Sequence, residues 1–211
     1  YIFYTGLTTY PFGPYGIKLA MAKTKDFKEF EKHPVTTFNS KAMGLFPEKV
    51  NGRMAALLTV HTDLPPAKIC LALFETQEDM WSPYFWEDWY ENLNDHIIHL
   101  MRDSRDQVEL GAPPVRVREG WLVIYSYIRN YLSNNKEFGI EAVLLDVKDP
   151  RRVIGRTDEP LISPQAEYEL HGEVGNVVFP TGAIVQGDTL SVYYGAADTR
   201  QCLATVSVSE L

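Results

Sequence analysis

Polar and aromatic side chains recur where three predicted strands end. They are Thr59, His61 and Asp63 after the first strand, Tyr125 and Ser126 after the second, and Tyr194 and Asp198 after the third. In a fold whose strands radiate from one axis, equivalent strand ends meet at one rim. Tyrosine rings and carboxylates gathered there suit a hydroxyl-rich ligand such as a carbohydrate, because such a ligand needs both hydrogen-bonding groups and flat apolar faces.

Signatures of several other chemistries are missing from the chain. It has no glycine-rich phosphate loop, no zinc-type spacing of Cys and His, and no nucleophile elbow. His96 and His99 are three residues apart but lack a third ligand, so we predict a surface pair and no metal site. We also predict no cofactor.

The charge and hydropathy of the chain disfavour two classes of partner, nucleic acids and membranes. The net charge of −8 disfavours nucleic acid, which is bound through clustered Lys and Arg. No apolar stretch is long enough to span a bilayer, so no membrane partner is expected. Cys70 and Cys202 both lie in apolar runs, which indicates reduced core thiols and favours the cytoplasm. The chain opens mid-strand at Tyr1, so we expect a piece of a longer protein, with any signal peptide before it.

The elements that must position the rim residues are repeated hairpins. Three times, a proline-marked strand leads into a glycine turn and then into a second apolar strand. The prolines recur at an almost constant interval, at Pro47, Pro114 and Pro180, with turn glycines Gly52, Gly120 and Gly187. Further strand-like runs follow at residues 69–74, 139–146 and 202–208, and residues 1–5 and 17–21 fit the same unit without its first strand. This long period favours a β-propeller over a β-sandwich or a solenoid.

Residues 75–106 interrupt the strand pattern. Ser82 as a cap, Pro83 in the first turn and aromatic residues at helical spacing predict a helix near residues 82–103. We expect its apolar stripe to pack on the propeller or on a second subunit, which leaves a homo-oligomer open. The alternative is a lid whose aromatic residues stack on sugar rings.

Five segments, in the same order along the chain, resemble glycoside hydrolase family 130, the mannoside phosphorylases and mannosidases. They are residues 45–52, residues 111–125, Leu144–Asp146 with Asp149-Pro150, residues 176–182 and residues 193–199. The resemblance implies an all-β, five-bladed β-propeller, of which about four blades lie in this chain. Residues 1–211 would form one propeller domain that lacks its N-terminal blade and carries the insertion at 75–106. It also implies a sugar site in the central pocket and inverting action on β-mannosides.

The chain departs from the family pattern at its phosphate-binding cations. The resemblance places Thr59 where the phosphorylases have Arg, Gln107 where they have Lys, and Ser126 where they have His. A phosphate dianion in a partly dry pocket needs compensating charge. We therefore predict an inverting hydrolase. One alternative is a phosphorylase that takes inorganic phosphate as co-substrate and draws its cations from a preceding blade, Arg129 or Arg53.

The proton donor of the family also has no counterpart, because Ala42 stands near its position. A glycan-binding propeller without catalysis is therefore the other alternative. Inverting hydrolysis needs an acid and a base about 6.5–9.5 Å apart. We predict Asp198, Asp63 and Glu109 as the catalytic candidates, with surface solvation as the alternative for each. The predicted substrate-binding residues are Glu48, Lys49, Tyr125, Ser126, Thr59, His61, Gln107 and Tyr194, and for Glu48 an ion pair with Lys49 is an equal alternative.

Overall fold

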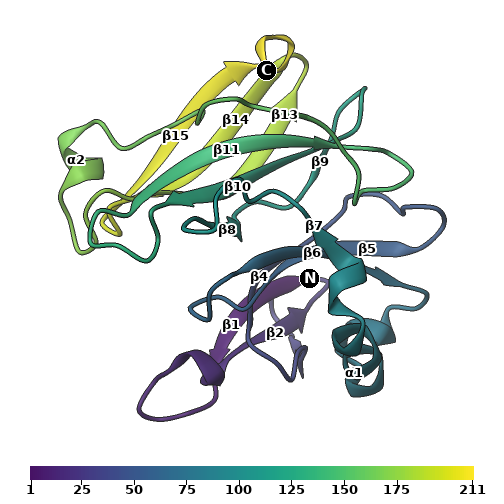
Figure 1. Cartoon of the computed structure of the whole chain (residues 1–211). Coiled ribbons are helices and arrows are strands. Elements are labelled where there is room, and N and C mark those ends of the chain that lie inside the picture. The colour runs from purple at the N-terminus through teal and green to yellow at the C-terminus, as the bar shows by residue number, and fades with distance from the viewer.

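The computed structural model describes residues Tyr1–Leu211 and consists of four antiparallel β-sheets that follow one another along the chain (Figure 1). The first sheet holds β1 (Ile2–Leu7), β2 (Ile17–Lys23) and β3 (Glu31–Pro34). The second holds β4 (Ser40–Leu45), β5 (Met54–Val60), β6 (Lys68–Phe74) and β7 (Ile97–Ile98). The third holds β8 (Gln107–Leu110), β9 (Val115–Arg116), β10 (Trp121–Arg129), β11 (Glu137–Leu145) and β12 (Val153–Arg156). The fourth holds β13 (Val178–Gln186), β14 (Thr189–Ala196) and β15 (Arg200–Ser207).

Each sheet is a meander, in which strands that follow in sequence lie side by side. In the third sheet both β8 and β9 pair with β10, so the segment that carries the repeated proline is split into two short strands. The repeated hairpins, the strand after each of them and the two-strand start at β1 and β2 are all as predicted. Four blade-like units therefore follow along the chain.

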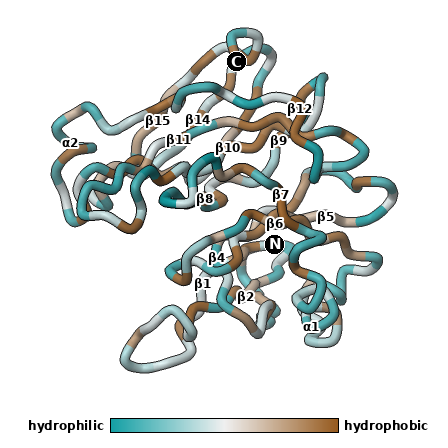
Figure 2. Tube along the Cα trace, in the orientation of Figure 1, coloured by the Kyte–Doolittle hydropathy of each residue, from teal (hydrophilic) through white to brown (hydrophobic).

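The strands of the middle sheets are buried on both faces because each sheet is sandwiched between neighbours. β5 and β10 are almost completely buried, which explains why they are continuous apolar runs rather than alternating ones. Three apolar clusters form the core: one between the first two sheets, one between the second and third, and one between the third and fourth. Figure 2 shows the apolar residues concentrated along these strands and the polar ones in the connecting loops.

Two glycines determine how closely neighbouring sheets can pack. A Cβ atom on Gly44 of β4 would lie 2.8 Å from Cα of Pro113, in the third sheet's first segment. A Cβ atom on Gly111 would lie 2.5 Å from the carbonyl oxygen of Pro180 in β13. Each glycine thus faces a proline of the following unit, and the sheets approach through backbone contact.

The insertion begins as predicted but is helical over a shorter range. Ser82 accepts a hydrogen bond from the Phe85 amide at 3.4 Å, and α1 (Pro83–Glu91) follows. The helix then ends, and residues after it form a short 3-10 turn, Leu93–His96, and the edge strand β7. The apolar spacing of this second half serves the edge of a sheet rather than a helix. A single-turn helix, α2 (Glu167–Leu170), lies before the fourth sheet.

The aromatic face of α1 packs on the second sheet of its own chain. Trp86 and Trp89 are buried, and their indole N–H groups donate to the carbonyl oxygens of Met80 and Leu71. Phe38 stacks on Trp89 with ring centres 5.8 Å apart. These tryptophans are therefore core residues and not a sugar-stacking lid. No helix combines the length and apolar character that crossing a bilayer would require.

Candidate functional site

The site lies at one end of the sheets, which we call the rim. There β4, β8 and β13 begin and β5, β10 and β14 end, since Ser40 pairs with Val60, Gln107 with Ile128 and Val178 with Ala196. Of the nine non-glycine residues with positive φ, all but Phe27 and Asn51 are at this end. They are Ala42, His61, Asp63, Asn130, Asn176, Ala197 and Asp198. Left-handed backbone costs energy for such residues and concentrates at functional sites.

A buried carboxylate, Glu109 on β8, is the centre of the rim. Its side chain accepts a hydrogen bond from the Thr62 hydroxyl at 2.9 Å, and its other oxygen lies 3.7 Å from the Lys41 ammonium. Glu109 is only 6% exposed, whereas the Lys41 side chain is 43% exposed. Lys41 therefore balances the charge of Glu109 and still faces open space.

Small polar residues surround this pair. The Thr59 hydroxyl accepts a hydrogen bond from the Leu110 amide at 2.8 Å, and Ser126 is the register partner of Glu109. The hydroxyl of Ser126 and the side-chain carbonyl of Asn39 are buried and have no partner within the chain. A buried polar atom left unpaired costs about 1–3 kcal/mol. Both atoms are enclosed by the chain, so they are a local cost of this arrangement rather than open positions for a ligand.

Asp63 joins the same neighbourhood through Tyr131. The Tyr131 hydroxyl donates to Asp63 at 3.0 Å. Burial, the hydrogen bond and charge of Asp63, and the charge of Glu109 together raise the pKa of Tyr131 to about 12. The phenol consequently stays protonated at neutral pH, and the charges of both carboxylates act on it. Asp63 therefore contacts Tyr131 directly, and Glu109 is close enough for its charge to act on that phenol.

His61 forms a second polar group at the rim. Its ring nitrogens lie 2.8 Å from the Tyr90 hydroxyl, which comes from α1, and 3.1 Å from the Lys68 ammonium. Burial and the Lys68 charge lower the pKa of His61, so the imidazole is neutral at neutral pH. α1 thus contributes one residue to the rim even though its tryptophans are buried.

A pocket opens beside Lys41. This axial pocket has a volume of about 440 Å³ and lies between the inner segments of the sheets. Lys41 and Ala42 of β4, Thr5 of β1, Gly111 and Thr181 contribute to its wall. Ala42 sits at a bulge in β4, where the register with β5 shifts between Lys41 and Met43. The position near the expected proton donor thus faces the pocket with a methyl group.

Several predicted site residues lie elsewhere. Glu48 and Lys49 are exposed in the β4–β5 turn, at the opposite end of the sheet from the rim, because that hairpin turns at Asn51-Gly52. The prediction that Glu48 and Lys49 lie at the rim is therefore wrong. Asp198 is exposed in the β14–β15 turn at the rim, and its carboxylate accepts no hydrogen bond within the chain.

Three further predicted residues are already bonded within the fold. The hydroxyls of Tyr125 and Tyr194 are buried and donate to Glu141 and Glu169, each at distances below 3.0 Å. Burial, followed by those carboxylates, raises the pKa of both phenols. Gln107 uses its side-chain oxygen to accept from the Ala67 amide. These three support the walls of the rim rather than facing its centre.

The structure adds residues that the sequence pattern did not single out as site residues. Lys41, Thr62 and Asn39 belong to the segments that begin β4 or follow β5, and Tyr131 follows β10. A sequence signal does exist for the β4 segment, since the interval from Pro47 to Pro114 puts residues 40–42 at the place that residues 107–109 hold in the next unit. That equivalence could have marked the segment of Lys41 as lying at the same end of the sheets as Glu109.

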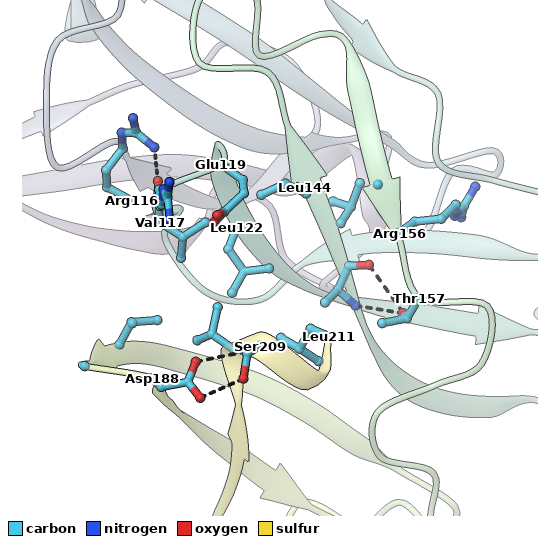
Figure 3. Close-up of a pocket in the computed structure, with 17 residues that line it drawn as sticks. Arg116, Val117, Glu119, Leu122, Leu144, Arg156, Thr157, Asp188, Ser209 and Leu211 are labelled. Carbon is cyan, nitrogen blue, oxygen red and sulfur yellow. Dashed lines mark hydrogen bonds between the residues drawn. The ribbon is translucent and has the colours of Figure 1, made fainter.

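A larger cleft of about 880 Å³ lies at the other end of the third and fourth sheets (Figure 3). Its wall is largely apolar, with Val117, Leu122, Leu144 and Leu211 among its residues. Figure 3 shows some of the polar groups there paired within the chain: Asp188 accepts from the Ser209 hydroxyl at 2.8 Å, and Arg116 donates to the carbonyl of Val117. The Nε atom of Arg156 is buried without a partner. Size alone therefore does not make this cleft the functional site.

Comparison with known proteins decides the family. A family model for glycoside hydrolase family 130, described as beta-1,4-mannooligosaccharide phosphorylase, matches residues 1–211. The chain belongs to glycoside hydrolase family 130. The predicted fold class, an all-β five-bladed propeller with about four blades in this chain, is thereby confirmed.

The curated relatives of this family 130 chain are phosphorylases. It is 31% identical over 197 residues to the 1,2-beta-oligomannan phosphorylase of Thermoanaerobacter sp. (strain X514), covering 92% of this chain and 60% of the relative. It is 33% identical over 200 residues to the beta-1,2-mannobiose phosphorylase of Listeria innocua, covering 93% and 52%. The chain therefore spans between half and three fifths of these relatives.

A solved structure of the Listeria innocua enzyme, in complex with beta-1,2-mannobiose, superimposes with a TM-score of 0.76 at 32% identity, covering 92% of this chain and 52% of that one. A second solved structure, described with the statement that the GH130 family of mannoside phosphorylases contains glycoside hydrolases that target beta-1,2 mannosidic linkages in Candida mannan, has a TM-score of 0.67 at 18% identity, covering 92% of this chain and 58% of that one. The second likeness concerns the fold alone.

Proposed function

We propose that this family 130 protein acts on β-mannosides and cleaves them by phosphorolysis. The bond from the mannosyl C1 to the glycosidic oxygen breaks, a bond from C1 to a phosphate oxygen forms, and the leaving oxygen takes a proton. The products are mannose 1-phosphate and a shortened acceptor. The observation that carries this proposal is the match of all 211 residues to the phosphorylase family model, supported by curated phosphorylases at 31–33% identity.

In this reaction Lys41 is the cation of the chain that can meet phosphate at the axial pocket. Lys41 lines the pocket and its side chain is partly exposed, so a phosphate oxygen can approach it. The other cations considered are placed less well: Arg53 pairs with Glu75 at 3.6 Å at the far end of the sheet, and Arg129 pairs with Glu159 at 3.2 Å.

Hydrolysis is the second candidate, and the surroundings of Glu109 favour it. Thr59, Gln107 and Ser126 are neutral where the resemblance places phosphate-binding cations, and Lys41 is already paired with Glu109. A dianion then lacks compensating charge, whereas a water molecule needs none. Asp63 accepts a hydrogen bond from Tyr131, and the charge of Glu109 acts on the same phenol, so two carboxylates are available as candidates for an acid and base pair.

The experiment that separates these candidates is a phosphate titration of the intact protein with short β-mannosides. Phosphorolysis requires a rate that rises with phosphate and a sugar 1-phosphate as product, detected by chromatography. Release of free mannose in phosphate-free buffer would establish hydrolysis instead. Calorimetric binding of the mannoside without any turnover would leave a glycan-binding propeller and refute both reactions.

A further inference from the structure

Residues 61–63, which follow β5, each contact a different element, and we call them the hub loop. Thr62 donates to Glu109 of β8 at 2.9 Å. Asp63 accepts at 3.0 Å from Tyr131, which follows β10. His61 contacts α1, the helix of the insertion. The hub loop therefore joins the insertion to the carboxylates of the rim.

The backbone of the hub loop is strained at two of its three residues. His61 and Asp63 have φ angles of 62° and 56°, in the left-handed region that residues other than glycine rarely adopt. Two backbone hydrogen bonds hold the loop: the His61 amide donates to the Asn39 carbonyl at 3.2 Å, and the Leu64 amide donates to the His61 carbonyl at 3.1 Å. A strained conformation persists where its surroundings over-determine it, so the side-chain contacts of the loop matter for its shape.

The His61 ring is held from both sides by a directional chain of hydrogen bonds. An ammonium group has donors and no acceptor, so Lys68 of β6 donates to Nδ1 of His61, at 3.1 Å. Nε2 of the neutral imidazole then carries the proton and donates to the Tyr90 hydroxyl, at 2.8 Å. Tyr90 itself stacks on Phe38 with ring centres 4.3 Å apart, which fixes the position of its hydroxyl. One of the two contacts of the imidazole thus comes from the insertion.

We propose that Tyr90 is a positioning residue of the candidate site, which acts through His61 to hold the hub loop in its strained conformation. In that conformation the other two side chains of the loop bond to Glu109 and Tyr131. The inference rests on the proposed function, because it gives the insertion the role of placing the carboxylates of that site. It assigns Tyr90 no contact with the substrate.

The first experiment compares two tyrosines of the same helix by steady-state kinetics on the intact protein. Tyr90→Phe removes the hydroxyl that His61 contacts and keeps the ring that stacks on Phe38. We expect kcat/KM for a short β-mannoside to fall about two- to tenfold, the size of one lost hydrogen bond. Tyr84→Phe is the matched control, since it removes a hydroxyl from a side chain that is 83% exposed, and it should leave kcat/KM unchanged.

The pKa of Tyr131 is a second readout, which a loss of stability alone would not move. Burial, Asp63 and Glu109 raise this pKa to about 12, and the Lys136 ammonium lies 5.1 Å from the ring centre. In Tyr90→Phe the hub loop relaxes and Asp63 moves away, so the pKa of Tyr131 should fall toward its usual value of about 10. Absorbance titration of Tyr90→Phe with and without Tyr131→Phe isolates that phenol. Tyr84→Phe should keep the value of the wild type.

A double-mutant cycle tests whether Tyr90 acts through His61. His61→Gly removes the imidazole, and glycine adopts the left-handed backbone freely. Once the imidazole is gone, adding Tyr90→Phe should cause no further loss of kcat/KM. A further loss as large as that of Tyr90→Phe alone would mean that Tyr90 meets the substrate directly, which overturns the positioning role.

The outcomes for the positioning role and for the proposed function are distinct. A pKa of Tyr131 that is the same in Tyr90→Phe as in the wild type overturns the positioning role, whatever the effect on kcat/KM, and leaves the proposed function standing. A wild-type protein that neither binds nor cleaves any mannoside refutes the proposed function. The Tyr131 titration still tests the hold of Tyr90 on the hub loop in that case, because it requires no substrate.

Discussion

Lys41 and Glu109 bring opposite charges to within 3.7 Å beside the axial pocket. Each charge therefore weakens the attraction of the other for a charged ligand. In Glu109→Gln the Lys41 ammonium loses its internal counter-charge and becomes free for an anionic ligand. We expect the KM for phosphate to fall about tenfold, a modest gain because Lys41 is partly solvated. Initial rates over a phosphate series measure this.

Glu119→Gln is the matched control for that substitution, since Glu119 is an exposed carboxylate in the turn at the far end of the third sheet. It should leave the KM for phosphate unchanged. If Glu109→Gln instead lowers kcat about a hundredfold or more and no phosphate dependence exists, Glu109 acts as a catalytic base and phosphorolysis is wrong.

The Tyr131–Asp63 hydrogen bond predicts a late-titrating phenol at the rim. Burial and Asp63 raise the pKa of Tyr131 from 10.0 to about 12. Because the folded pKa is raised, the stabilisation from this contact is complete below pH 10 and is lost as the pH rises through 12. In Asp63→Asn one phenol should therefore ionise at lower pH than in the wild type. Phenolate absorbance titration detects it, and the shift must vanish when Tyr131→Phe is added.

At the scale of elements, α1 is fixed by its two tryptophans. Trp86 is fully buried against Phe38, Phe74 and Phe85. Trp86→Ala should lower the free energy of unfolding by about 3–5 kcal/mol, because it leaves a cavity where packed rings were. Tyr84→Ala, on the exposed face of the same helix at 83% exposure, should change it by less than about 0.5 kcal/mol. Urea denaturation compares them, and equal losses would mean that the helix is not held by Trp86.

The strands and α1 show which parts of the fold could be predicted from the sequence and which could not. Strands and the start of α1 were readable, because hairpins recur and Ser82-Pro83 is a local start signal. The end of α1 was not, since apolar residues 97–101 fit a helix and an edge strand equally well. The alternation of side chains along β10 separates two predicted site residues that are neighbours in sequence, Tyr125 and Ser126. Tyr125 points toward Glu141, whereas Ser126 lies on the opposite face of the sheet, the face of Glu109. The bulge at Ala42, which helps place Lys41, left no sequence signal.

At the scale of the whole molecule, the recurring prolines and glycines hold the sheets together. Pro113 is met by Gly44 of the preceding unit, and Pro180 is met by Gly111. The repeat that first indicated a propeller therefore also forms the contacts between successive units near the axis. Because the axial pocket is lined by Gly44, Gly111 and Pro113, the same contacts set its width. Stability and the shape of the pocket thus depend on one set of close backbone approaches.

Gly111→Ala tests this dependence. Its new Cβ atom would meet the Pro180 backbone oxygen at 2.5 Å, so the third and fourth sheets must move apart. We expect a loss of about 1–3 kcal/mol in the free energy of unfolding, the usual effect of overpacking, together with weaker mannoside binding. Gly182→Ala is the control, because its Cβ would have only ordinary contacts, 3.8 Å from the Tyr193 ring. Denaturation and calorimetry measure both variants. Of these two positions, Gly111 alone lacks room for a methyl group. If both variants lose the same free energy of unfolding and the same mannoside affinity, the glycine–proline contacts do not set the spacing of the sheets.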